Sequence, residues 1–215
     1  MARTDTKLIL MERDIAIINE VSRWRFLLGR QIKELFSFPS QRACDRRIEK
    51  LTKNGYLEPK NILVGFPRLY FLGSQAKKLE TVVRYSTKQN LSRIDHDIAV
   101  VDTALYFIKN YGVKLENIMT ERQLRAEDGF GIRTHKPDFV FSIRGKTACT
   151  EVEFTAKSKE KFTENMTTNF MNYDHQFWIV PQNQKKILAL FNDTNMANSR
   201  VIYWEIIASH VRPKK

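Results

Sequence analysis

Residues 134–158 read THKPDFVFSIRGKTACTEVEFTAKS, and this stretch decides the fold of the second half of the chain. Two runs within it, PDFVFSI and ACTEVEFT, have the apolar content of strands, and a short polar turn joins them, so they predict a hairpin. Alternate residues of a strand share a face, so Glu151 and Glu153 project together. Asp138 enters the neighbouring strand directly after a proline. The stretch therefore places three carboxylates on two adjacent strands.

Carboxylates held this close together need a positive partner. Asp138, Glu151 and Glu153 are candidate oxygen ligands for a hard divalent cation, Mg²⁺ or Mn²⁺. Such a cation would activate a water and offset charge on a phosphodiester. Lys157 shares the face of the two glutamates if the strand continues that far, and its ammonium would add positive charge. The alternative is an exposed sheet face on which the glutamates pair with lysines.

The composition predicts a folded protein that does not enter a membrane. The chain has 215 residues, of which 42% are hydrophobic and 11% aromatic, enough for one large domain or two small ones. No apolar run approaches the roughly 18 residues that span a bilayer. Cys44 and Cys149 are far apart and lack a metal-ligand spacing, so we expect free thiols in a reducing, cytoplasmic compartment.

The net charge of +12 indicates a polyanionic partner, of which nucleic acid is the commonest. The charge is uneven along the chain. Residues 1–93 hold 19 Lys and Arg against 9 Asp and Glu, whereas residues 94–215 hold 17 against 15. The first part is therefore the expected phosphate-binding part. The alternative is a basic surface that serves only solubility.

Residues 1–85 predict a winged helix-turn-helix DNA-binding domain. Helical patterns cover 11–21, 24–36 and 40–54, strand-like runs cover 56–59 and 68–73, and a further helical pattern covers 74–85. Three helices followed by a hairpin is the winged-helix order, with the third helix as the recognition element. The candidate DNA contacts are Gln41, Arg42 and Arg46 on that helix and Lys60 and Arg68 on the wing. Winged helices also serve as protein-interaction modules, which is the alternative here.

Residues 86–93 are polar and aperiodic, and we interpret them as a linker to a second domain over 94–215. That domain has the predicted order αβββαβ followed by an extra helix and strand, so the chain is a two-domain α+β or α/β protein. The predicted helices cover 95–112, 158–172 and 183–191, and the predicted strands cover 117–124, 137–143, 148–155, 177–181 and 200–207.

Pro137-Asp138 followed by Glu151-Val152-Glu153 within this order resembles the PD-(D/E)XK nuclease superfamily, to which restriction endonucleases belong. The resemblance implies a restriction-endonuclease-like fold and metal-dependent cleavage of DNA. The sequence departs from the motif in one respect, because Glu153 stands where a lysine is expected. Lys157 is the candidate replacement.

Both halves together resemble the replication-relaxation family, and within it the MobC-type plasmid relaxases, over roughly residues 11–205. This resemblance rests on the winged-helix pattern, His96-Asp97 at a helix start, Glu121 on the first strand, the Asp after Pro, and the acid-x-acid strand. The resemblance implies nicking of double-stranded plasmid DNA at a transfer origin, at the start of conjugative mobilisation, with a relaxosome accessory or coupling protein as a further partner.

The same resemblance implies roles for single residues. Asp138, Glu151 and Glu153 become metal ligands, Glu121 a fourth acid and Lys157 the catalytic cation. His96 becomes a general base or an orienting group. Plainer alternatives are a helix start stabilised by its acidic residues for the His-Asp pair, and solvated positions for Glu121 and Lys157.

Two other functions stay open. One is a non-catalytic DNA-binding replication or relaxosome accessory protein, and the other is a restriction-type endonuclease that cuts both strands. The sequence has no His-x-His pair and no GxxxxGK[ST] phosphate loop, so neither a three-histidine relaxase site nor ATP hydrolysis is expected. Tyr106, Tyr111, Tyr173 and Tyr203 are available, and no pattern selects one as a nucleophile.

Overall fold

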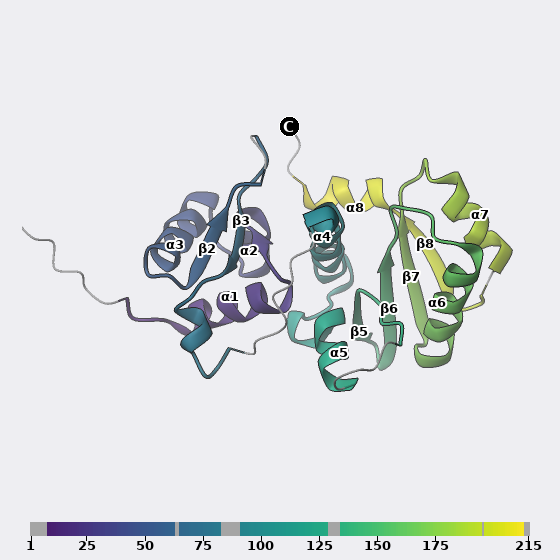
Figure 1. Cartoon of the computed structure of the whole chain (residues 1–215), viewed down its shortest axis with the longest axis horizontal. Coiled ribbons are helices and arrows are strands. Elements are labelled where there is room, and N and C mark those ends of the chain that lie inside the picture. Colours follow the sequence, from purple (N-terminus) through teal and green to yellow (C-terminus); the bar gives the residue numbers. More distant parts are fainter. Residues whose placement is uncertain (1–7, 63–64, 83–90, 129–133, 195, 213–215) are drawn as a thin grey trace, which may run out of the picture. The chain divides into compact units, whose positions relative to one another are not determined.

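The computed structural model describes residues 8–62, 65–82, 91–128, 134–194 and 196–212, and its fold is mixed α+β (Figure 1). The chain divides into two compact units, Met1–Gln89 and Asn90–Lys215. The boundary falls within the segment predicted as a linker, most of which lies outside the described residues. In the portion that the structure describes, no helix combines the length and the apolar character that crossing a membrane requires.

The first unit contains three helices and a small antiparallel sheet. The elements are α1 (Glu12–Arg23), β1 (Leu27–Leu28), α2 (Gly29–Leu35), α3 (Gln41–Lys53), β2 (Leu57–Lys60) and β3 (Leu69–Leu72), and the strand order is β1-β3-β2. The Ser40 side chain caps α3 by accepting a hydrogen bond from the Ala43 N–H at 3.2 Å. The helix buries its Cys44, Ile48 and Leu51 stripe and leaves the basic face exposed.

Two predictions in this unit are wrong. Residues 24–36 are not one helix, because Leu27 and Leu28 pair with β3 and only α2 is helical. The helix predicted over 74–85 is a single 3-10 turn, Ala76–Lys78, in its described part. There the Gln75 N–H donates to the Gly55 carbonyl at 2.9 Å, so the backbone is tied to the turn after α3 instead of entering a helix.

The second unit contains a five-stranded sheet with the order β4-β5-β6-β7-β8. β4, β5 and β6 are antiparallel, whereas β6, β7 and β8 are parallel. Its strands are β4 (Ile118–Thr120), β5 (Phe139–Ile143), β6 (Lys146–Val152), β7 (His175–Val180) and β8 (Ser199–Tyr203). Its α-helices are α4 (Ile94–Tyr111), α5 (Glu121–Asp128), α6 (Lys159–Asn172), α7 (Lys185–Thr194) and α8 (Trp204–Val211).

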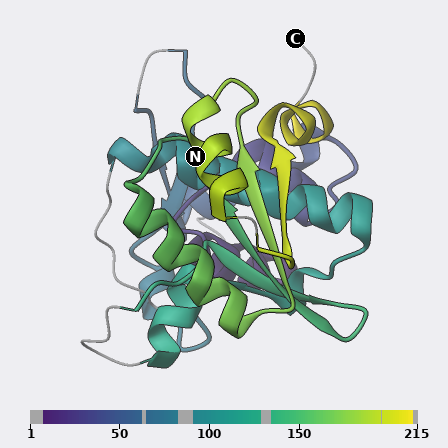
Figure 2. The same cartoon turned by 90° about the vertical axis from the view of Figure 1, so that its right-hand side faces the viewer.

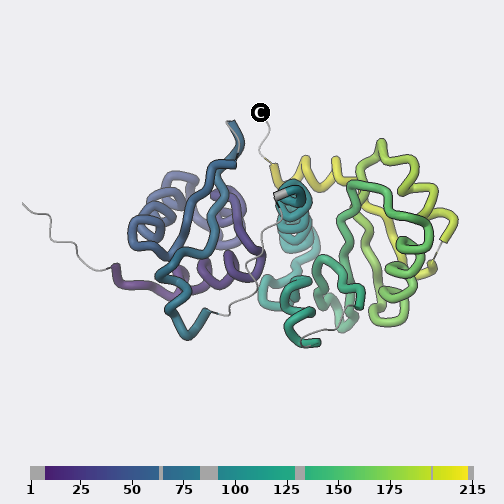
Figure 3. The backbone as a smooth tube through the Cα atoms, in the orientation of Figure 1, coloured from purple at the N-terminus to yellow at the C-terminus, as the bar shows by residue number. Residues whose placement is uncertain are grey.

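Helices cover both faces of this sheet, with α6 in front of it and α4 behind it in Figure 2. Behind it, the Phe107 ring of α4 packs at a tilt against Phe141 and Phe177, with ring centroids 4.8 Å and 5.1 Å apart. The front cluster consists of Phe162, Met166, Trp178, Val180 and Ile187 from α6, β7 and α7. Because β6 and β7 are parallel, the chain returns between them through α6 (Figure 3).

The predicted hairpin is present as β5 and β6. Arg144 and Gly145 have φ values of 51° and 75° between the paired residues Ile143 and Lys146. A two-residue turn with both φ values positive matches the twist of the flanking strands. β6 ends at Val152 and not at the predicted residue 155, although the Glu153 N–H still donates to the Ile179 carbonyl at 2.9 Å.

Two further strand predictions are wrong in part. The strand predicted over 117–124 stops at Thr120, and α5 follows. Thr120 and Gln123 form a capping box, since the Thr120 N–H donates to Gln123 Oε1 at 2.9 Å and the Gln123 N–H donates to Thr120 Oγ1 at 3.4 Å. The strand predicted over 200–207 stops at Tyr203, opposite Val180 at the end of β7, and α8 begins at Trp204.

Candidate functional site

One cavity of about 570 Å³ in the second unit collects the catalytic candidates. It lies where β5 begins and β6 ends, beside the first turns of α4 and α5. Its lining includes all six residues that the sequence analysis assigned to catalysis, namely His96, Glu121, Asp138, Glu151, Glu153 and Lys157. Residues separated by more than fifty positions in the sequence therefore meet at one place.

Asp138 is held by the backbone of β6 and by His96. Its Oδ2 accepts a hydrogen bond from the Val152 N–H at 2.8 Å and lies 3.4 Å from His96 Nε2. The other ring nitrogen, Nδ1, lies 3.3 Å from Asp97 Oδ1. Burial lowers the pKa of His96, but the Asp138 and Asp97 carboxylates outweigh burial and raise this pKa to about 10. Burial raises the pKa of Asp138, but His96, the Val152 N–H and Arg93 together outweigh burial and lower it.

Glu151 has two partners that the sequence analysis missed. Its Oε1 accepts hydrogen bonds from His135 Nε2 at 2.6 Å and from Asn169 Nδ2 at 2.9 Å. The Glu151 side chain is 6% exposed and that of His135 is 10% exposed. The carboxylate is therefore positioned from two sides, by the segment before β5 and by α6.

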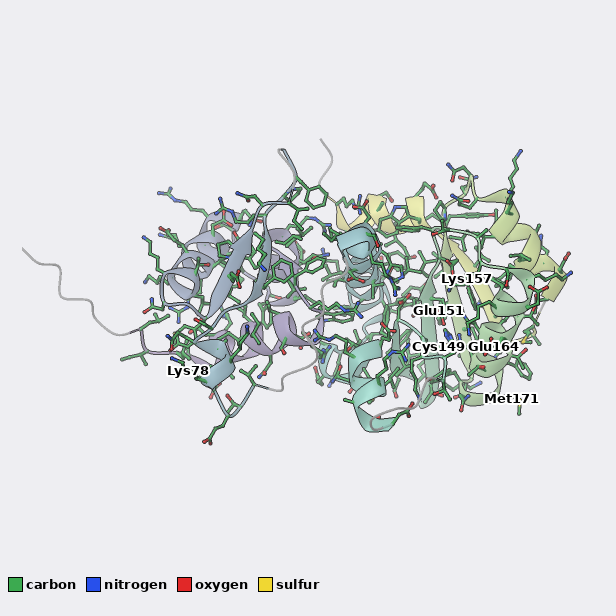
Figure 4. All side chains as sticks on the ribbon, in the orientation of Figure 1. Lys78, Cys149, Glu151, Lys157, Glu164 and Met171 are labelled. Carbon is green, nitrogen blue, oxygen red and sulfur yellow. The ribbon has the colours of Figure 1, made fainter. Side chains whose placement is uncertain are left out.

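Glu153 forms an ion pair with Lys157. Burial raises the pKa of Glu153, and although Lys157 opposes this, the Glu151 and Asp138 carboxylates raise it further. Burial lowers the pKa of Lys157, but the same three carboxylates outweigh burial and raise it. Figure 4 places Glu151 on β6 and Lys157 in the segment that leads into α6. The like charges of the three acids are thus close enough to act on one another.

Glu121 occupies the first position of α5 and not a strand. Its N–H donates to the Asp138 carbonyl at 2.8 Å, which places it beside the β5 entry. Its Oε1 accepts from Arg125 Nε at 3.0 Å and from Arg125 NH2 at 2.9 Å. Glu121 is therefore a paired acid at the cavity and not a solvated strand residue.

Cationic side chains from four segments also line the cavity. They are Arg93, Arg125, Lys136, Lys157 and Lys161. Lys136 pairs with Asp128 at 2.7 Å, and the pair between Lys161 and Glu164, at 2.9 Å, is more than half exposed. An exposed ion pair contributes little to stability, so such a lysine exchanges partners easily for a phosphate.

The carboxylates supply the chemistry of a hard-cation site, but each is held by its own partner. Among the residues that the structure describes, no three acidic, histidine or cysteine side chains converge as a metal cage. Asn165 also lines the cavity, and its side-chain carbonyl oxygen, Oδ1, is buried and has no hydrogen-bond partner in the described chain. Carboxylate and amide oxygens are the ligands that Mg²⁺ and Ca²⁺ take. The donor set therefore has the chemistry that suits a divalent cation.

The DNA-binding candidates lie in the first unit and differ in availability. Arg42 and Arg46 are exposed on α3, and Gln41 is exposed but donates to Asp45 Oδ1 at 2.8 Å. Lys60 lies 4.9 Å from the centre of the Phe71 ring and 3.4 Å from Glu58, and Arg68 is exposed and donates to Asn61 Oδ1 at 3.3 Å. Of these five candidates, Arg42 and Arg46 on α3 are the basic residues most available to a polyanion.

Both cysteines are buried and free. Burial raises the pKa of the Cys44 thiol to about 12 and raises that of Cys149 still further. Neither thiol is therefore a nucleophile near neutral pH.

Comparison with protein-family models, with curated proteins and with solved structures found no match.

The residues that the sequence analysis missed, His135, Asn165 and Asn169, had only weak local signals. His135 stands three residues before Asp138, and the asparagines are four apart on a helix.

Proposed function

We propose that this protein is a metal-dependent DNA endonuclease that nicks one strand, a relaxase-type enzyme whose substrate is a plasmid transfer origin. The observation that carries the proposal is the meeting of His96, Glu121, Asp138, Glu151, Glu153 and Lys157 in one cavity. These residues were selected from sequence for phosphodiester cleavage, and they come from five separate segments. The plasmid transfer origin is the substrate that the resemblance to MobC-type relaxases implies.

The topology of the second unit supports the nuclease part of the proposal. The second unit has an antiparallel β4-β5-β6 meander after a long helix, followed by a parallel crossover to β7. Apart from α5 between β4 and β5, this order agrees with the αβββαβ order that the resemblance implies. Acidic residues at the start of β5 and the end of β6 are then adjacent at one end of the sheet.

The first unit supports DNA as the partner. Its element order, a helix, a short strand, two helices and a two-stranded hairpin, agrees with the order expected of a winged helix. The third helix carries exposed arginines and is capped at its N-terminus by a serine. Such a helix fits the major groove, and its arginines suit phosphates or guanine edges.

The cavity suggests a division of roles in cleavage. Asp138, Glu151 and Glu153 would hold the cation, which when bound supplies Lewis-acid stabilisation of the phosphoryl oxygens. The Lys157 ammonium adds positive charge at the same place. Without the cation, His96 has a pKa of about 10 and stays protonated at neutral pH, and in that state it orients Asp138.

A water molecule is the nucleophile that the cavity favours. Among the described residues that line it there is no tyrosine, so the tyrosines noted in the sequence do not supply the attacking oxygen from this cavity. Tyr173 lies nearby, and burial followed by the charges of Cys149 and Glu151 raises its pKa to about 12. Such a phenol is a poor nucleophile at neutral pH.

The test is a gel of supercoiled plasmid carrying the candidate origin, incubated with the protein and Mg²⁺ or Mn²⁺. We expect open circles and no early linear product, because one chain offers one acidic cavity and so cuts one phosphodiester at a time. Relaxed plasmid and an EDTA lane are the controls. Linear product as early as open circle would instead indicate a restriction-type enzyme.

One observation favours a second candidate, a non-catalytic DNA-binding accessory protein. Each acid already has its own positive or hydrogen-bonding partner, as in the pairs of Glu153 with Lys157 and Glu121 with Arg125. A set of compensated ion pairs can be purely structural. Tight binding of origin DNA without any product, with either metal, would select this candidate.

A further inference from the structure

Two asparagines on α6 face the acidic strand. Asn165 is 2% exposed and Asn169 is fully buried, and they lie four residues apart on one face of the helix. Asn169 Nδ2 donates to Glu151 Oε1 at 2.9 Å. The side-chain carbonyl oxygens of both asparagines are buried and have no hydrogen-bond partner within the described chain.

The spacing of this pair matches the spacing of the two glutamates. α6 is the crossover between the parallel strands β6 and β7, so it runs antiparallel to β6. Four helical residues rise about 6 Å, and two strand residues rise about 6.6 Å. Since Asn169 contacts Glu151, one helical turn earlier brings Asn165 to the level of Glu153. Asn165 lines the same cavity as both glutamates.

A buried carbonyl without a donor costs free energy, because it has lost its water and gained nothing in exchange. Asn165 Oδ1 therefore needs a partner that enters from the cavity. A hard cation is such a partner, since side-chain amide oxygens coordinate divalent metals together with carboxylates. The adjacent glutamates would supply the charge, and the amide would add an oxygen ligand without a further negative charge.

We propose that Asn165 Oδ1 is an oxygen ligand of the divalent cation, together with the carboxylates of Glu151 and Glu153. Asn169 then acts as a positioning residue that orients Glu151 toward the same cation. This inference rests on the proposed metal-dependent nuclease and adds to it a helix-borne ligand that the acidic motif does not contain.

The test is calorimetric titration of the whole protein with Mn²⁺, and thermal unfolding without metal. We expect Asn165→Leu to weaken Mn²⁺ binding by roughly tenfold or more, while its metal-free Tm stays at or above that of the wild type because an unsatisfied carbonyl has been removed. Asn165→Asp keeps the size and adds a charge, and we expect it to bind Mn²⁺ more tightly. Asn172→Ala, at an exposed position on the same helix, is the matched control and should bind as the wild type does.

Equal Mn²⁺ affinity in the wild type and Asn165→Leu would overturn the inference, because it would mean that the Asn165 carbonyl does not coordinate the cation. If Asn165→Leu does not fold, unchanged affinity in Asn165→Asp overturns it instead. Plasmid nicking measured on the same preparations separates the two proposals. If the wild type nicks plasmid and the variants bind Mn²⁺ as tightly as the wild type does, Asn165 is not a ligand but the proposed nuclease function is retained. If the wild type neither nicks plasmid nor binds Mn²⁺, both the ligand role of Asn165 and the nuclease function are wrong.

Discussion

At the scale of single residues, the cavity is a set of buried acids whose charges are balanced by neighbouring bases. Among them, His96 has a pKa of about 10, because the Asp138 and Asp97 carboxylates overcome burial. A histidine whose folded pKa lies above its unfolded value of about 6.5 stabilises the folded state most at low pH. That stabilisation is fully present below about pH 6.5 and is lost as the pH rises toward 10.

We therefore expect the free energy of unfolding to fall between pH 7 and pH 10, and to fall less in His96→Gln. The physical reason is that the wild type must give up the imidazolium–carboxylate pair with Asp138 over this range. Urea unfolding at both pH values measures the difference, and subtracting the variant from the wild type removes the titration of lysines and tyrosines. A ring-proton NMR titration gives the His96 pKa directly, and a value near 6.5 would contradict this prediction.

At the scale of elements, α3 uses neighbouring arginines for different purposes. Arg42 and Arg46 are exposed, whereas Arg47 forms an ion pair with Asp14 of α1, whose side chain is 1% exposed. The Asp14 carboxylate also accepts a hydrogen bond from the Met11 N–H at 2.7 Å. Arg42 and Arg46 of α3 are therefore available at the surface, whereas Arg47 holds α1 against α3.

We expect Arg42→Ala and Arg46→Ala to weaken DNA binding, each lowering the slope of log affinity against log salt by about one if it contacts a phosphate. A residue that reads a base would instead lose about 1–3 kcal/mol of preference for the cognate site. Binding isotherms at several salt concentrations on cognate and scrambled DNA distinguish the two effects.

Arg47→Ala is the matched comparison, and we expect a different result. Removing this partner leaves Asp14 buried and unpaired, so the variant should lose about 3 kcal/mol of stability. Its salt slope should equal that of the wild type. If Arg47→Ala changed the salt slope and the two exposed arginines did not, α3 would bind DNA through another face.

At the scale of the whole molecule, charge and chemistry are divided between the two units. The excess of basic residues lies in residues 1–93, and the acidic cavity lies in the second unit. In the proposed function, binding free energy and transition-state stabilisation come from different parts of the chain, so a change in one should leave the other nearly intact.

We expect Asp138→Asn and Glu151→Gln to abolish nicking while affinity for origin DNA stays within about twofold of the wild type. Each substitution keeps the shape of the side chain and removes one anionic ligand. Gel-shift titration and the plasmid assay on the same protein measure the two properties. Nicking at the wild-type rate by both variants would place the chemistry elsewhere.

Much of the fold could be read from local sequence patterns. The apolar runs PDFVFSI and ACTEVEFT predicted β5 and β6, and the helical patterns over 40–54 and 95–112 predicted α3 and α4. These signals are local, because side-chain periodicity and capping depend on residues three or four apart. The error at β4 is also explained locally, by the Thr120–Gln123 capping box, a signal that the apolar pattern outweighed.

The acids of the candidate site could also be chosen from sequence, because Asp138, Glu151 and Glu153 follow a strand pattern with a chemical meaning. Their partners could not. The packing of α4 brings His96 to Asp138. The crossover of α6 brings Asn169 to Glu151, which His135 also contacts, and it places Asn165 at the same cavity. By itself the sequence determined the strands and their charges. Only the tertiary structure decided which side chains face them, because such contacts join segments far apart in the chain and are set by sheet order and helix packing.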